Sequence, residues 1–129
     1  MNNTQTLNES MPAGKLYDLS IIEAVSGGDE EFVRKMVELF IETVPVNLQE
    51  LNTFVDRKNW DMVSKMAHKL KSTLDSMGIQ ALKQDVRTVE MTAKNNEAVE
   101  NIPVLVKRMN LVVECCILQL ETEILQNAS

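Results

Sequence analysis

The sequence contains a single histidine, His68, and this scarcity excludes several kinds of site at once. A His-Glu-x-x-His zinc motif, or a cage built from two or three histidines, needs more than one imidazole. The chain also has no phosphate-binding loop of the Gly-x-x-x-x-Gly-Lys type, no Gly-x-Gly-x-x-Gly turn and no Gly-x-Ser-x-Gly elbow. We therefore expect no metal site, no cofactor and no ATP-binding segment in this chain.

Turn-forming residues and cysteines are also scarce. Four glycines and three prolines argue against a fold rich in β-turns and favour long helices. The two cysteines, Cys115 and Cys116, are adjacent, a spacing that rarely forms a disulfide, which fits a reducing compartment. No apolar run approaches the ~20 residues of a membrane span, and the N-terminus is polar, so we expect a cytoplasmic protein without membrane contact.

Positive charge is in short supply as well. Thirteen Lys and Arg residues face 19 Asp and Glu residues, which gives a net charge of −6 at neutral pH. We expect no nucleic-acid binding, because contacts to phosphates need clustered cations. What the chain does contain is apolar: 44% of its 129 residues are hydrophobic, enough for the core of one domain.

The pattern along the chain predicts one helical domain. Residues 1–15 are polar and interrupted by Pro12 and Gly14, so we expect a flexible tail before a single domain over residues 16–129. Apolar residues then recur at helical spacing. The expected helices cover residues 18–26, 30–57, 60–77, 79–94 and 101–125. The expected fold class is all-α: an up-down-up-down four-helix bundle with a short extra N-terminal helix.

Helix boundaries and buried faces can also be predicted. Asp29, Asn59 and Asn101 stand where N-caps are expected, and Gly27 and Gly78 stand where helices should end. Inside the longest helix a proline, Pro45, should cause a bend. The apolar face of that helix comprises Val33, Met36, Val37, Phe40, Val44, Leu51, Phe54 and Val55, and the face of the last helix comprises Leu105, Met109, Val112, Val113, Cys116, Leu120 and Ile124.

The helical wheel places the single histidine on the outside of its helix. With Leu70 set at zero and about 100° per residue, His68 falls at about 160°, nearly opposite the core face. That core face comprises Val63, Met66, Ala67, Leu70, Leu74 and Met77. His68 should therefore point to solvent. Met62 lies at the margin of the stripe, where it fits either the core or a contact surface.

The neighbours of His68 suggest a reaction with an anionic group. Lys65, Lys69 and Lys71 surround it, and no acidic residue occurs between positions 62 and 74. Ser64 and Ser72, one turn to either side, are small. A neutral imidazole offers one nucleophilic nitrogen, and a phosphoryl group bound there would be stabilised by the lysines. This pattern fits a phosphoryl-accepting histidine, with an idle surface histidine as the alternative.

The stretch AHKLKSTLDSMG, residues 67–78, resembles the motif of histidine-containing phosphotransfer (HPt) domains. His68, Leu70, Lys71 and Gly78 match that motif at its spacing. The preceding helix, with its internal proline, and the Val-Glu pair that contains Glu90 are also similar to the family pattern. The resemblance covers about residues 16–125 and implies the helical fold described above.

The resemblance also implies a function. His68 would accept a phosphoryl group, through a ring nitrogen, from the phospho-aspartate of a receiver domain and pass it to another receiver. The partners would be receiver domains of response regulators or hybrid histidine kinases, which would supply Mg²⁺. The chain itself would be a carrier and not an enzyme, and Lys71, which matches the motif, would stabilise the phosphoryl group. Lys69 and Lys65 are expected to help stabilise that group or the docked partner because they lie near His68 on the helix. One domain with one exposed site also favours a monomer.

Two positions depart from the family pattern. Ser72 stands where the family often has glycine, at the point where a docked receiver comes close; serine is still small. Glu90 stands where relatives often have glutamine, which can orient the histidine. A glutamate would repel a phosphoryl group unless it points to a lysine or away from the site, and a solvated flanking position is the other interpretation.

Two other functions are alternatives to the phosphoryl carrier. The first is a non-catalytic helical adaptor in which His68 is idle. The second is a haem bundle that uses His68 and a methionine. The outward orientation of His68 opposes haem ligation, and no Cys-x-x-Cys-His motif is present.

Overall fold

The structure is a computed structural model that describes residues 14–126. Every regular element in that range is helical, which confirms the all-α class. The elements are α2 (Ser20–Ser26), α3 (Glu30–Asp56), α4 (Trp60–Ser76), η1 (Gln80–Leu82), α5 (Lys83–Asn95), η2 (Val99–Asn101), α6 (Ile102–Leu120) and a π-helical segment, η3 (Glu121–Gln126). No helix of the described range is long and apolar enough to cross a membrane.

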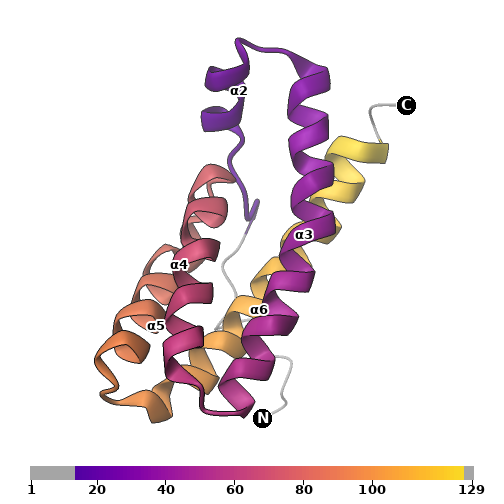
Figure 1. Cartoon of the computed structure of the whole chain (residues 1–129). Helices are drawn as coiled ribbons and strands as arrows, with labels where there is room; N and C mark the ends of the chain where they lie inside the picture. Colours follow the sequence, from indigo (N-terminus) through magenta and orange to yellow (C-terminus); the bar gives the residue numbers. More distant parts are fainter. Residues whose placement is uncertain (1–13, 127–129) are drawn as a thin grey trace.

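The four long helices pack as a ring. α3 contacts α4, α4 contacts α5, α5 contacts α6, and α6 closes the ring against α3. Short connections join successive helices at alternate ends, so neighbours run in opposite directions (Figure 1). α3 extends past the end of α4, and α2 packs against this extension (Figure 1). Because α4 and α5 are adjacent, side chains of both can meet at their shared outer edge.

Most predicted helix ends are confirmed. The side chain of Asp29 accepts hydrogen bonds from the N–H groups of Glu31 and Phe32, and Asn59 accepts from Met62. Asn101 is the exception: its side chain makes no cap, because the turn η2 already places its backbone in the helical region and leads directly into α6. The helix α3 continues through Pro45 as one element.

The buried residues confirm most of the predicted apolar helix faces, and only positions at the edges of these faces differ. On α6 the buried positions alternate at spacings of four and three residues, which is the pattern of a helix packed along one seam. This repeat includes Ile102 and Val106, whereas Leu105 and Ile124, predicted as core, lie beside the seam and are only partly buried. On α3, Met36 and Phe54 are likewise partly buried and Leu48 is buried instead.

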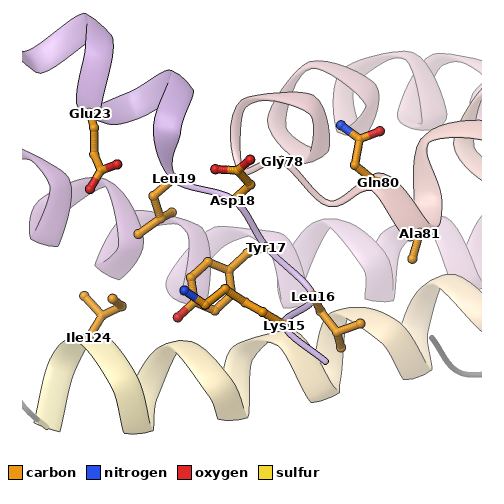
Figure 2. Close-up of a pocket in the computed structure, with 10 residues that line it drawn as sticks. All are labelled: Lys15, Leu16, Tyr17, Asp18, Leu19, Glu23, Gly78, Gln80, Ala81 and Ile124. Atoms are coloured by element: carbon orange, nitrogen blue, oxygen red, sulfur yellow. The ribbon is translucent and has the colours of Figure 1, made fainter. Parts of the chain in front are cut away.

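The segment before α2 lies across one end of the bundle. The backbone N–H of Leu16 donates to Gln119 Oε1 (2.8 Å), and the Tyr17 hydroxyl donates to Glu123 Oε1 (2.6 Å). On the other side, the N–H of Asp18 donates to the carbonyl of Met77 (3.0 Å). Figure 2 shows this segment running between the C-terminal helix and the turn after α4. Of the predicted tail, residues 1–13 lie outside the described range.

Gly78 is the point at which this segment comes closest to the turn after α4. Its φ of +65° lies in the left-handed region, and a Cβ at this position would lie 2.7 Å from the Cβ of Asp18. Gly78 therefore does more than end the helix, which is the role that the sequence predicts. The glycine also leaves the space in which Asp18 packs (Figure 2).

We predict that Gly78→Ala destabilises the protein by more than Gly27→Ala does. Both glycines have nearly the same φ, +65° and +67°, but a Cβ at Gly27 would meet nothing within 4 Å. Both variants carry the backbone strain of about 1 kcal/mol, and only Gly78→Ala adds overpacking of about 1–3 kcal/mol. Urea denaturation followed by circular dichroism measures both. Equal losses in the free energy of unfolding would contradict the tight contact with Asp18.

Candidate functional site

His68 lies in the middle of α4, on the face that points away from the core. The side chain of His68 is 69% exposed, as the helical wheel predicts. Its neighbours Ala67 and Leu70 are fully buried and fix the rotation of the helix about its axis. The imidazole is therefore held at the surface by a well-packed helix, and a second protein can reach it.

A carboxylate from the neighbouring helix contacts the imidazole. Glu90 on α5 places Oε2 2.7 Å from His68 Nδ1, and its Oε1 accepts a hydrogen bond from Lys71 Nζ at 2.9 Å. Only 19% of the Glu90 side chain is exposed, and both of its oxygens are bonded. Glu90 thus joins the two residues of α4 that the motif singled out, and it points to a lysine.

The electrostatics of this cluster determine where the imidazole proton lies. The hydrogen bond from Lys71, with a smaller contribution from His68, holds the pKa of the Glu90 carboxyl below its ordinary value against a partial desolvation that raises it. Glu90 is therefore ionised at neutral pH and can only accept hydrogen bonds. In the neutral imidazole, Nδ1 of His68 then carries the proton and donates it, which leaves a lone pair on Nε2.

The other residues predicted for the site occupy the same outer face. Ser72 is exposed one turn after His68, and Lys69 is exposed with no hydrogen-bond or ion-pair partner among residues 14–126. Lys65 Nζ lies 3.2 Å from Asp61 Oδ2. The net positive charge around His68 is therefore lower than the sequence predicts. Asp61, which precedes the stretch without acidic residues, pairs with Lys65, and Glu90 pairs with Lys71.

A hollow of about 620 Å³ opens beside His68 and Glu90. It lies between the first half of α4 and the second half of α5. Lys65 and Lys94 contribute its cations, and Trp60 contributes an aromatic wall. Lys94 was not among the residues predicted from the sequence, although its spacing of four residues from Glu90 places it on the same side of α5. The complete lining is Trp60, Asp61, Ser64, Lys65, His68, Glu90, Ala93, Lys94 and Asn96.

A second contact fixes how α4 and α5 lie against each other. Arg87 on α5 donates to both carboxylate oxygens of Asp75 on α4, at 2.6 and 3.2 Å. A two-pronged contact between a guanidinium and a carboxylate constrains both distance and orientation. It lies one turn from the Lys71–Glu90 bond on each helix. It therefore helps to hold the register that brings Glu90 to His68.

A larger hollow, of about 770 Å³, lies at the other end of the bundle beside the segment before α2 (Figure 2). Its lining includes Lys15, Asp18 and Gln80 but not His68. The backbone N–H of Asp18 and the hydroxyl of Tyr17, both in this lining, are bonded to Met77 and Glu123 and hold the segment in place. We take the smaller hollow as the candidate site because His68 and Glu90, which are in direct contact, line it. In the range 14–126, no three His, Cys, Asp or Glu side chains are grouped to hold a metal ion.

We predict that Lys71→Met raises the pKa of Glu90 toward its ordinary value, because Lys71 is the main cause of the depression. A carboxyl with a depressed folded pKa stabilises the fold above its unfolded pKa, and that contribution fades as the pH falls through the folded pKa. The stability lost in Lys71→Met should therefore be largest near neutral pH and shrink in acid. Carboxyl carbon NMR titration and denaturation at several pH values measure the two effects.

Lys69→Met is the matched control for this prediction. It removes the same charge two positions away on α4, from a lysine with no bonded partner in the described part of the chain. The titration of Glu90 should be nearly unchanged in that variant. If Lys71→Met and Lys69→Met moved the titration equally, the effect would be general electrostatics and not the hydrogen bond.

Comparison with known protein families identifies the fold. Residues 35–127 match the model of the Hpt domain family, which spans most of the chain. No curated protein and no solved structure matches the chain significantly. Hpt domains carry phosphoryl groups within phosphorelays, interact there with receiver domains and have no ATP site of their own. The chain therefore belongs to the Hpt domain family, and its role is phosphotransfer in a phosphorelay.

Proposed function

We propose that His68 is the residue that carries the phosphoryl group, accepting it on Nε2 from a receiver phospho-aspartate and delivering it to the aspartate of a second receiver. The observation that carries this proposal is the exposed imidazole whose Nδ1 lies 2.7 Å from an ionised carboxylate. That contact leaves Nε2 unprotonated and turned away from Glu90. The chain holds no other histidine that could take the group.

The transfer needs little chemistry from this chain. The Nε2 lone pair attacks phosphorus, and the bond between phosphorus and the aspartyl oxygen breaks with its electrons left on the receiver's carboxylate. Positioning and charge stabilisation dominate such reactions. The receiver would supply Mg²⁺ and the acidic pocket. Lys71, which is bonded to the carboxylate beside the imidazole, and Lys94, which lines the adjoining hollow, would stabilise the arriving charge. The chain acts as a monomer in this scheme.

The outer face of α4 leads from His68 to an apolar edge suited to docking. His68, Ser72 and Ser76 follow one another at spacings of four residues, about 6 Å per step. Ser76 lines a shallow groove together with Leu39 of α3. Leu39 is 50% exposed at this edge, so it offers apolar surface that a docked partner could cover. We assign the receiver's contact surface to this edge together with the small serines that allow close approach.

We predict that His68→Gln abolishes phosphoryl transfer and leaves the fold intact. Glutamine is polar and suits a helix, but it has no nucleophilic nitrogen. Helical content and melting should hardly change, because the imidazole is mostly exposed and makes no core contact. The measurement is transfer of labelled phosphate from phosphorylated receiver domains of the source organism, with circular dichroism as the folding control.

Two results would reject this assignment. One is residual labelling of folded His68→Gln protein, which would place the phosphate on another residue. The other is a wild-type protein that no receiver of its organism can phosphorylate, which would leave the adaptor function. Genuine phosphohistidine is also lost in acid and retained in base, which distinguishes it from a phosphate ester on serine.

We predict that Leu39→Glu slows transfer from a receiver at least about tenfold, because it places a charge in an apolar contact that must lose its water. Val104→Glu is the control: Val104 is 72% exposed, but it lies on α6, which packs mainly against α3 and α5 in the ring. Transfer rates at low receiver concentration measure both. A slowing in Val104→Glu equal to that in Leu39→Glu would place the docking surface elsewhere.

A further inference from the structure

The hydrogen bond from Lys71 determines whether residue 90 can offer a hydrogen-bond acceptor to His68. An ammonium group has only donors, so the atom that it contacts must be an acceptor. The Oε1 of Glu90 is bonded to Lys71 at 2.9 Å, and its Oε2 is the atom at 2.7 Å from His68 Nδ1. A carboxylate has a second acceptor to offer. A glutamine amide in the same place has none, because its oxygen would face Lys71 and its NH₂ would face Nδ1.

We propose that Glu90 is a positioning residue that keeps the Nδ1 proton on His68 through the whole transfer cycle, so that the phosphorylated imidazole stays cationic and discharges readily at neutral pH. This inference rests on the proposed function of His68. It also assigns glutamate a role that glutamine cannot fill while Lys71 is present.

The proton balance of the cycle shows what this proton does. At rest, Nδ1 carries the proton and Nε2 the lone pair. When Nε2 bonds to phosphorus, the ring becomes an imidazolium and the Nδ1 proton stays. When the bond between nitrogen and phosphorus breaks, its electrons return to Nε2 and the resting imidazole is restored. No proton enters or leaves the ring, and the leaving group is a neutral imidazole rather than an imidazolate anion.

The carboxylate of Glu90 favours the protonated ring more strongly than the nearby cations disfavour it, because the carboxylate is in direct contact with Nδ1. Lys65 and Lys94 line the adjoining hollow, and Lys65 is paired with Asp61. Lys71 is bonded to Glu90 itself. Among the groups further along the two helices, Arg87 is bonded to Asp75.

The remaining charges lie away from the ring. Lys69 is exposed on the outer face of α4, and on the side of α5 that faces α6, Asp85 is bonded to Arg108. An opposite charge at hydrogen-bond distance favours the protonated ring, whereas exposed charges several ångströms away are weakened by water and salt.

The single histidine makes this inference directly measurable. Protein labelled with ¹⁵N-histidine and free of any purification tag gives the signals of one imidazole. Potassium phosphoramidate phosphorylates imidazole without any receiver, so the phosphorylated state is prepared independently of the proposed function. Ring nitrogen NMR then gives the position of the proton at rest and the pH at which the phosphorylated ring loses it. The rate of phosphate loss across the same pH range is the chemical readout.

Three variants separate the possible causes. In Glu90→Gln we expect the resting proton to move to Nε2. We also expect the phosphorylated ring to lose its proton at a pH at least about one unit lower, and phosphate loss near neutral pH to slow several-fold. The double variant Glu90→Gln with Lys71→Met frees the amide oxygen to accept from Nδ1, so the resting proton should return to Nδ1. Glu114→Gln, an exposed position on α6, is the control for loss of one negative charge and should behave as the wild type.

The outcomes keep the two proposals apart. Glu90→Gln protein that is folded, with the wild-type proton position and the wild-type pH profile of phosphate loss, overturns this inference and leaves the proposed function standing. Wild-type protein that shows the expected proton position and pH profile after phosphoramidate treatment, yet accepts phosphate from no receiver, overturns the proposed function alone.

Discussion

The carboxylate of Glu90 bridges two helices, because one of its oxygens bonds the imidazole of His68 and the other bonds Lys71. This bridge requires α4 and α5 to keep one register, since a slip of a single residue would move a side chain by about 1.5 Å along the helix and around it by about 100°. Buried residues on both helices and the Asp75–Arg87 contact hold that register. The reactivity of an exposed side chain thus depends on packing beneath it.

The sequence predicts those features of the site that depend on one helix. Helical periodicity is local, so it places His68 outside and Leu70 inside without knowledge of any neighbour. The Lys65–Asp61 pair is local as well, because the two residues are four positions apart on one helix, so it is predictable from the sequence alone. The sequence therefore predicts positive charge around His68, but it overestimates that charge because Asp61 and Glu90 each pair with a lysine.

The features that join different helices could not be predicted in the same way. Whether Glu90 points to solvent or to His68 depends on the relative rotation and height of α4 and α5, which no periodicity within either helix specifies. The same holds for Gly78, whose left-handed conformation is a local signal but whose contact with Asp18 is not. On α6 and α3 the predicted apolar faces were correct in the centre, and only their margins depended on the neighbouring helices.

The segment across the end of the bundle adds buried residues to the core that lie before the part of the chain matched by the family model. The family match starts at residue 35, inside α3. Yet Leu16, Tyr17, Leu19 and Ile22 are all buried in the same core as the four long helices. Each such side chain contributes about 1.5–3 kcal/mol by leaving water. A fragment cut at the family boundary would expose the apolar surface that these residues cover and would lose the free energy that their burial contributes.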